Sequence, residues 1–247
     1  MKSLSLLTVA LAVFCSASVA LGQKSPAASS SSPSSAALPR TEVYHVHFNH
    51  AAAGKASALA DFLKTPGSNT PMPGHLLVLR HEDGAPWDYV AIQHIGTKAT
   101  VEAAGNPRSQ AMRTLSDWHD DTFVNGPSWA DFAKAMGLDD EGKSKSAESV
   151  YIVSVYRPVP GHEDALEKFL SEPPSASNDL AVGTVLMQHL EGGAWRYFAI
   201  SRYKSWQDYA TSEVNSMAQT AKGQGGWFTL REHISFHNDT ITSRVAP

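Results

Sequence analysis

The chain of 247 residues contains 11 histidines, and two of them are separated by a single residue. His45 and His47 lie in the segment TEVYHVHFNH (41–50), whose β-branched and aromatic residues are typical of a strand. Alternate side chains of a strand share a face, so Asn49 lies on the same face as both imidazoles. Histidine binds metals, forms hydrogen bonds through both ring nitrogens and titrates near neutral pH. The segment could therefore carry a metal site, a ligand pocket or a general base.

A metal ion bound by His45 and His47 needs at least one further ligand. The sequence offers several histidines and aspartates for this role: His81, His119, His189, His233, His237, Asp121 and Asp239. None of them belongs to a compact metal motif such as His-Glu-x-x-His. We therefore expect the histidines to line a ligand pocket without a metal ion, and a His-ligated metal centre is the alternative. The sequence identifies no cofactor.

Two short segments share the pattern His-x-Asp-Thr, namely HDDTF (119–123) and HNDTI (237–241). In a structural interpretation, the aspartate or threonine hydrogen bonds to the local backbone in a turn. In a catalytic interpretation, Asp239 orients His237, which then acts as a general base near neutral pH. His233 precedes His237 by four residues, so we expect both on one face of either a strand or a helix.

Two aromatic pairs recur at the same spacing, Trp87 with Tyr89 and Trp195 with Tyr197. Large aromatic side chains dominate the burial of protein cores, so core packing is the first interpretation. The functional alternative is that Trp87 and Trp195 form a stacking surface for a flat ligand.

The sequence repeats itself in three blocks that keep their order. GKASALADFLKTP (54–66) matches GHEDALEKFLSEP (161–173), VLRHEDGAPWDYVAI (78–92) matches LMQHLEGGAWRYFAI (186–200), and HDDTF matches HNDTI. Chance similarity would not keep three blocks in register, so we interpret the chain as a duplication. The expected repeats are residues 41–136 and 149–247, joined by a polar linker at 137–148.

Both repeats predict the same order of elements. A first strand (43–48 and 150–156) precedes a helix that ends near Pro66 or Pro173. A hairpin follows, with strands at 76–81 and 87–93 or at 185–189 and 195–201. A second helix is expected at 101–112 and at 206–221. The end of each repeat is ambiguous, and residues 228–242 fit either a strand or a continuing helix.

This order, β-α-β-β-α with a possible last β, is the ferredoxin-like pattern. Two such copies in one chain resemble the dimeric α+β barrel superfamily, which includes the antibiotic-biosynthesis-monooxygenase-like and stress-responsive barrel families. The resemblance implies an α+β fold of two tandem ferredoxin-like repeats whose sheets face each other in an intramolecular barrel. Activities in that superfamily include cofactor-free oxygenation, haem degradation, isomerisation and ligand binding, so the resemblance implies a pocket but no particular reaction.

The alternation of side chains predicts which faces line that pocket. Tyr44, Val46 and Phe48 form an apolar face, which we expect to pack under the helices. The opposite faces of the two first strands are mixed, and we expect them to face the barrel interior. Their polar members are His45, His47, Asn49, Ser154 and Tyr156.

The N-terminal residues predict export. Residues 1–22 combine an early lysine, an apolar run and small residues, as a signal peptide does. Residues 23–40 are rich in Ser, Ala and Pro, and we expect a disordered leader. No later segment is apolar enough to span a bilayer, and a net charge of −4 gives no reason to expect nucleic acid or a membrane as a partner. A monomer and a homodimer are both compatible with the sequence.

We therefore expect an exported α+β barrel that binds a small molecule in a histidine-lined pocket. The enzymatic alternative is a cofactor-free oxygenase or isomerase with His237, Asp239 and His47 as catalytic residues. The remaining alternative is the His-ligated metalloprotein.

Overall fold

The computed structural model describes residues 38–67, 70–97, 109–145, 149–172, 179–191, 193–224 and 226–247. The expected signal peptide, nearly all of the expected leader and part of the linker lie outside these ranges.

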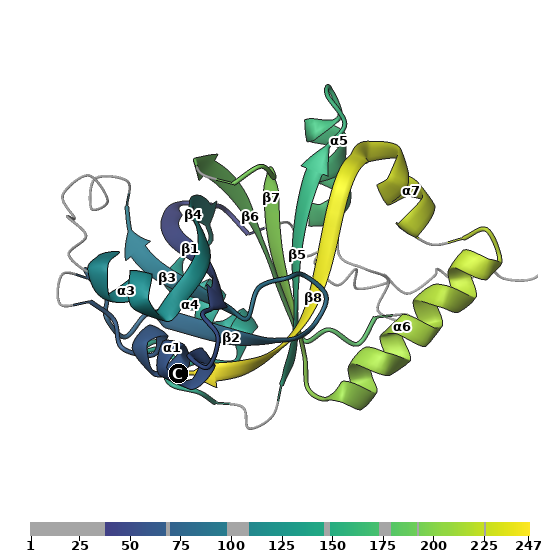
Figure 1. Ribbon diagram of the computed structural model, residues 1–247. Coiled ribbons are helices and arrows are strands. Elements are labelled where there is room, and N and C mark those ends of the chain that lie inside the picture. The colour runs from purple at the N-terminus through teal and green to yellow at the C-terminus, as the bar shows by residue number, and fades with distance from the viewer. Residues whose placement is uncertain are drawn as a thin grey trace, which may run out of the picture. The chain divides into compact units, whose positions relative to one another are not determined.

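The described residues form eight strands and six helices (Figure 1). The first half contains β1 (Glu42–Ala51), α1 (Ala56–Leu63), β2 (Leu76–Asp83), β3 (Tyr89–Gly96), α3 (Ser109–Leu115), β4 (Ser116–Gly126) and α4 (Trp129–Met136). The second half contains β5 (Val150–Pro158), α5 (Glu163–Ser171), β6 (Gly183–Glu191), β7 (Tyr197–Tyr203), α6 (Trp206–Ala221), α7 (Gly226–His233) and β8 (Ile234–Ala246).

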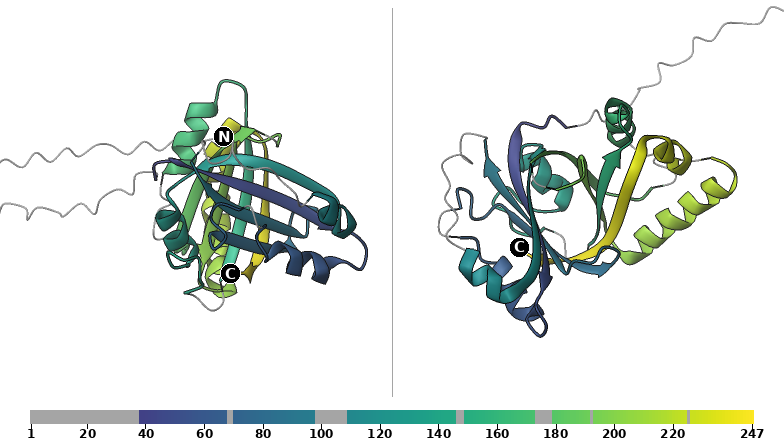
Figure 2. Two further views of the ribbon diagram at one scale, coloured as in Figure 1. Left: turned by 90° about the vertical axis from the view of Figure 1, so that its left-hand side faces the viewer. Right: turned by 45° about the horizontal axis from the view of Figure 1, so that its top comes forward.

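The strands close into one antiparallel barrel in the order β1-β3-β2-β8-β5-β7-β6-β4. Within the first half the neighbours are β4-β1-β3-β2, and within the second half they are β8-β5-β7-β6. Pairing of β2 with β8 and of β4 with β6 joins the two halves. The strands form a ring in the right-hand view of Figure 2. The prediction of an α+β barrel is thus confirmed.

Both segments whose structure was ambiguous in the sequence contain a helix followed by a strand. In the second half, α7 ends at His233 and β8 begins at Ile234; in the first half, α3 ends at Leu115 and β4 begins at Ser116. The helix expected at 206–221 coincides with α6. The one expected at 101–112 overlaps α3, and its residues 101–108 lie outside the described ranges.

The faces of the first strand are opposite to the prediction. Tyr44, Val46 and Phe48 are buried in a cluster that takes side chains from seven of the eight strands, so they fill the barrel interior. The mixed face with His45 and His47 lies outside. The expectation was wrong because the inner faces of the strands pack on one another across the barrel, and burial there favours the apolar face. Ser154 and Tyr156 lie outside for the same reason, since they alternate with interior residues of β5.

Helices cover both the outer face and one end of the barrel. Leu59 and Leu63 of α1 pack with Val78 and Ala91 on the outer face of the sheet. Helix α4 adds Trp129, Phe132 and Met136 to the interior cluster, at the end of the barrel where β1 begins and β4 ends. Local sequence defines α4: Ser128 accepts a hydrogen bond from the Asp131 amide at its start, and Gly137 ends it with a φ of 74°. None of the described helices has the length and hydropathy of a membrane span.

Candidate functional site

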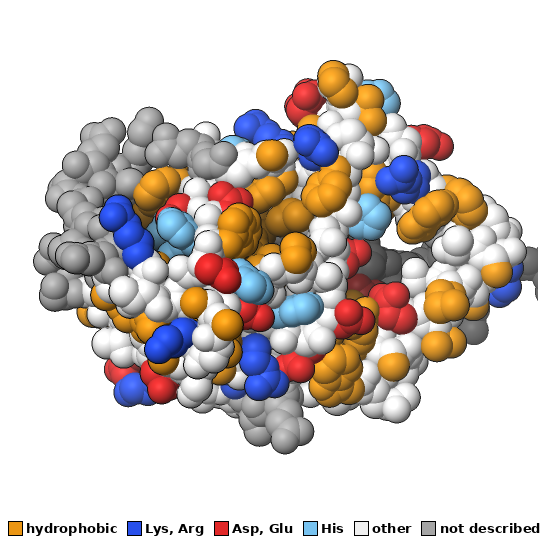
Figure 3. Space-filling view, viewed as in Figure 1, with side chains coloured by type: hydrophobic (Ala, Val, Ile, Leu, Met, Phe, Trp, Pro, Cys, Tyr) orange, Lys and Arg blue, Asp and Glu red, His pale blue; other side chains and the backbone are white. Residues whose placement is uncertain are grey.

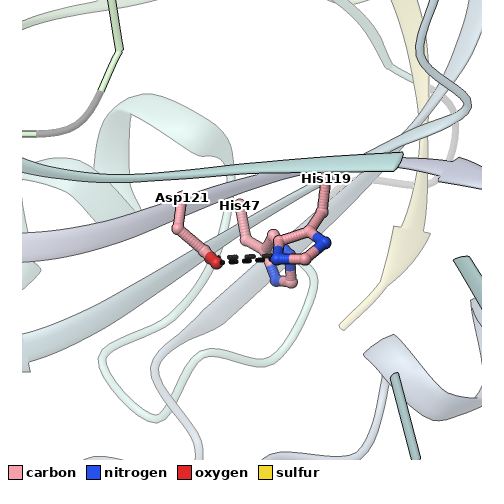
Figure 4. A group of neighbouring side chains, drawn as sticks. All are labelled: His47, His119 and Asp121. Carbon is pink, nitrogen blue, oxygen red and sulfur yellow. Dashed lines mark ion pairs between the residues drawn. The ribbon is translucent and has the colours of Figure 1, made fainter. Parts of the chain in front are cut away.

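The pairing of β1 with β4 brings the two histidine motifs of the first half together. In this register His47 lies opposite Asp121, and Asn49 lies opposite His119. The Nε2 atom of His47 is 3.4 Å from Asp121 Oδ1, and that of His119 is 3.5 Å from Asp121 Oδ2 (Figure 4). Two histidines and a carboxylate from strands more than 70 residues apart thus converge on the outer face.

His45 supports the carboxylate of this group. Its Nε2 atom is 2.9 Å from Asp121 Oδ1, within hydrogen-bonding distance. Burial on its own would raise the pKa of Asp121, but the hydrogen bond from His45 and the charges of the three histidines hold it below its usual value. Asp121 is therefore an ionised acceptor at neutral pH. His50, the remaining histidine of the segment, lies apart and pairs with Asp117 at 2.5 Å.

The second half carries only part of this arrangement. His237 Nε2 is 3.7 Å from Asp239 Oδ2, and Ser154 lies opposite Asp239 where His47 lies opposite Asp121. The ring of Tyr156 stacks on His237 with centroids 6.2 Å apart. Burial and the charge of Asp239 raise the pKa of Tyr156, so its hydroxyl stays protonated.

His233 does not belong to this group, so the prediction that it shares a face with His237 was wrong. Helix α7 ends at His233, and His237 lies in β8. The Nδ1 atom of His233 lies 3.0 Å from Nδ1 of His162 instead. The change of element between positions 233 and 234 separates the two side chains.

The interior face has its own polar group at the end of the barrel opposite α4. His81 continues the interior series of β2, and His189 continues that of β6. The Nε2 atom of each is buried and has no hydrogen-bond partner among the described residues. The ring of His81 lies 5.9 Å from Trp87, and that of His189 lies 5.3 Å from Trp195.

Phe48 connects these two pairs, because its ring lies 5.3 Å from Trp87 and 6.5 Å from Trp195. Both tryptophans are nearly buried in the interior cluster, which confirms the core packing expected for them. We call this end of the interior the barrel mouth; it comprises Phe48, His81, Trp87, Asp120, His189 and Trp195. In Figure 3 hydrophobic side chains gather in a hollow near the centre of the view, with histidine and acidic side chains beside it.

Asp120 is a member of the barrel mouth that sequence reasoning missed. It lies opposite Phe48 in the β1–β4 register and therefore faces the interior. Burial, together with the negative charge of Asp121, raises its pKa, whereas the charge of His189 lowers it. The alternation of side chains along HDDTF could have revealed that its two aspartates point in opposite directions.

Comparisons with known proteins identify the fold. No protein-family model and no curated protein sequence matches the chain. An anthrone oxidase-like protein superposes with a TM-score of 0.56 and 10% identity, over 85% of this chain and 93% of its own. A candidate monooxygenase from Fusobacterium nucleatum subsp. nucleatum gives 0.50 and 9%, over 83% and 93%. One from Lactobacillus acidophilus NCFM gives 0.49 and 10%, over 83% and 95%.

The chain has an α+β barrel fold similar to that of these solved structures. In this α+β barrel the predicted site residues fall into three separate places. The outer face of the first half holds His45, His47, Asn49, His119 and Asp121; that of the second half holds Tyr156, His237 and Asp239; the barrel mouth holds His81, His189, Trp87 and Trp195. They therefore do not form the single histidine-lined cavity that the sequence predicted.

The sequence did not predict one further polar cluster, which consists of Glu42, His75 and His94. His94 is 3% exposed, and its ring nitrogens lie 2.8 Å from Glu42 Oε2 and 2.9 Å from His75 Nδ1. The ring of Trp129 stacks on His75 at 4.2 Å. Because Glu42, His75 and His94 are far apart in sequence and form no motif, only the structure reveals this contact.

Proposed function

We propose that the chain is an exported protein that binds a flat, largely apolar small molecule at the barrel mouth. The observation that carries this proposal is the pair of buried Nε2 atoms of His81 and His189, which have no partner among the described residues. A buried polar atom without a hydrogen bond costs about 1–3 kcal/mol. A ligand with hydrogen-bonding groups on its edges would remove this cost at both histidines.

The chemistry of the mouth supports the choice of ligand class. Phe48, Trp87 and Trp195 offer ring faces and edges, which favour stacking on a planar molecule. Asp120 adds a carboxyl group, whose pKa is raised by burial and by the charge of Asp121 and which can hydrogen bond to a polar group of the ligand. A ring system with carbonyl or hydroxyl groups fits this combination.

A tandem duplication accounts for the two matching halves of the mouth. Each half has the same order of elements and strands, and His81 with Trp87 in one corresponds to His189 with Trp195 in the other. We propose that both halves descend from one ferredoxin-like unit. Closure within one chain permits a monomeric binding protein, and a homodimer is also compatible with this arrangement.

The test is a binding titration with anthrone, a flat tricyclic ketone chosen because an anthrone oxidase-like protein shares the fold. Tryptophan fluorescence should report saturable binding, because Trp87 and Trp195 line the mouth. The variants His81→Phe and His189→Phe keep the ring and remove the hydrogen bond, so each should weaken binding about tenfold, equivalent to 1.4 kcal/mol. The matched control is His119→Ala on the outer face, which should bind normally.

Binding that is unaffected by both phenylalanine variants would place the ligand elsewhere. If neither anthrone nor a panel of planar ketones, quinones and phenols changes the fluorescence or the melting temperature, the proposed ligand class is wrong.

A second candidate function is a cofactor-free oxygenase or isomerase that uses the outer face of the second half. Its support is the His237–Asp239 pair beside Tyr156, in which the carboxylate would orient the imidazole as a general base. The phenol of Tyr156 would then donate to the ligand. Oxygen consumption or isomerisation that disappears in His237→Ala and persists in His81→Phe would support this function. In the first half His47 is the catalytic candidate, opposite Asp121, the counterpart of Asp239.

A further inference from the structure

We propose that His47, His119 and Asp121 bind one divalent transition-metal ion, with zinc as the best fit. This site is separate from the barrel mouth and does not depend on the proposed function. All three side chains lie on the outer face of the β1–β4 pair, and one ligand atom from each lies within 4.8 Å of the others (Figure 4).

The spacing of these atoms is close to that of a coordination sphere. Zinc binds imidazole nitrogen and carboxylate oxygen at roughly 2.0–2.2 Å, so neighbouring ligands in a tetrahedral site lie about 3.3–3.5 Å apart. His119 Nε2 lies 3.5 Å from Asp121 Oδ2, and His47 Nε2 lies 3.4 Å from the other carboxylate oxygen, Oδ1. An ion can therefore be accommodated with small rotations of the side chains.

The surroundings include the outer partners that metal ligands usually have. His45 lies 2.9 Å from Asp121 Oδ1 and would hold the carboxylate in position while Oδ2 binds the ion. Asn49, fully buried on the same face, donates to the backbone oxygen of His47 and fixes the strand at that position. His45 is thus a positioning residue rather than a ligand.

The three ligands leave a position for water or a small anion. His119 and Asp121 are 47% and 43% exposed at their side chains, whereas His47 is 13% exposed. The ion would therefore be anchored from the wall of the barrel and open on its outer side. Two histidines and one carboxylate with a free position are typical of reactive rather than purely structural metal sites.

The second half supplies an internal contrast. His237 and Asp239 correspond to His119 and Asp121, but Ser154 stands where the first half has His47. A serine hydroxyl is a poor ligand for zinc compared with imidazole. The proposal therefore predicts one ion per chain, although the His-x-Asp pattern occurs twice.

The experiment is a calorimetric titration of the purified chain, without a polyhistidine tag, with ZnCl2. The expected stoichiometry is one. Loss of an outer partner of a metal ligand typically weakens binding 10–100-fold, and His45→Ala should weaken zinc binding about tenfold. His119→Ala and Asp121→Asn each remove a ligand, so each should weaken zinc binding by more than about 100-fold. The control is His237→Ala, which should leave affinity and stoichiometry unchanged.

The absorption spectrum of bound Co2+ reports the geometry of the site as well as the affinity. Co2+ bound in a tetrahedral site gives intense visible absorption, which should appear at one equivalent and disappear in His47→Ala and His119→Ala. Circular dichroism of each variant separates a lost ligand from a lost fold, and His119 is exposed enough to be replaced without unfolding. No binding by the folded parent, or unchanged binding in folded His119→Ala, would overturn the proposal.

Discussion

Asp120 and Asp121 are adjacent in β4, and their carboxylates lie on opposite sides of the barrel wall. Asp120 lies opposite Phe48 at the barrel mouth, and Asp121 lies opposite His47 on the outer face. Their environments have opposite electrostatic effects, because the pKa of Asp120 is raised and that of Asp121 is lowered. Two neighbouring residues of one type thus belong to two different candidate sites.

Substitution by asparagine should separate these roles. The folded-state pKa of Asp120 is raised by burial and by Asp121, so ionised Asp120 opposes folding at pH values above 3.8, its ordinary value. Asp120→Asn should therefore unfold at a higher urea concentration than the parent at pH 7, with a smaller difference near pH 4. Asp121→Asn, which removes the acceptor of three histidines, should unfold at a lower concentration. Equal effects of the two substitutions would contradict the assignment to opposite faces.

The buried His94 and the half-buried His75 predict a loss of stability in mild acid. Burial lowers the pKa of His94 and of His75 below 6.5, and Glu42 offsets this only in part. As the pH falls below 6.5, the unfolded chain takes up protons that these folded imidazoles do not, so the free energy of unfolding falls. His94→Gln should show a smaller decrease between pH 7 and pH 5 in urea titrations. If the free energy of unfolding of His94→Gln falls as much as that of the parent, other groups cause the acid sensitivity.

The interior of the barrel should be the most sensitive part of the fold. Leu77 is fully buried in the interior cluster, and Leu77→Ala should reduce the free energy of unfolding by about 2–5 kcal/mol. Leu190 is 46% exposed, and the same change there should cost no more than about 0.5 kcal/mol. Thermal or urea unfolding of the two variants measures the difference; similar values would mean that the interior packs loosely.

One substitution should give the second half the third metal ligand that it lacks. Ser154 occupies the place of His47, so Ser154→His would complete a second set with His237 and Asp239. The zinc stoichiometry should then rise from one to two in a variant whose circular dichroism matches the parent. A folded variant that still binds one ion would show that the outer faces of the two halves differ in geometry.

The sequence predicted the barrel fold, but it did not predict which face of each strand points into the barrel. Repeated blocks and alternating apolar residues placed most of the strands and helices, because these patterns are local. They could not tell whether Tyr44, Val46 and Phe48 pack against helices or against the opposite sheet, since both environments are apolar. The pattern of residues 228–242 was ambiguous because a helix and a strand meet there, at His233 and Ile234.

The candidate sites depended on contacts that no local pattern encodes. His47 and Asp121 meet only because β1 pairs with β4 in one register, and a shift of one residue would put Asp120 in that place. The sequence named His119 and Asp121 as possible partners of His47 among several others. Choosing between them required the strand order.

Among the described residues, every strand of the closed barrel has a hydrogen-bonded neighbour on both sides. The sheet therefore offers no edge to which another chain could add a strand, and this removes a common route to fibrous aggregation. Self-association would have to use side chains on the outer surface instead. Val214 and Met217 of α6, which are 64% and 68% exposed, are the apolar side chains best placed for such a contact.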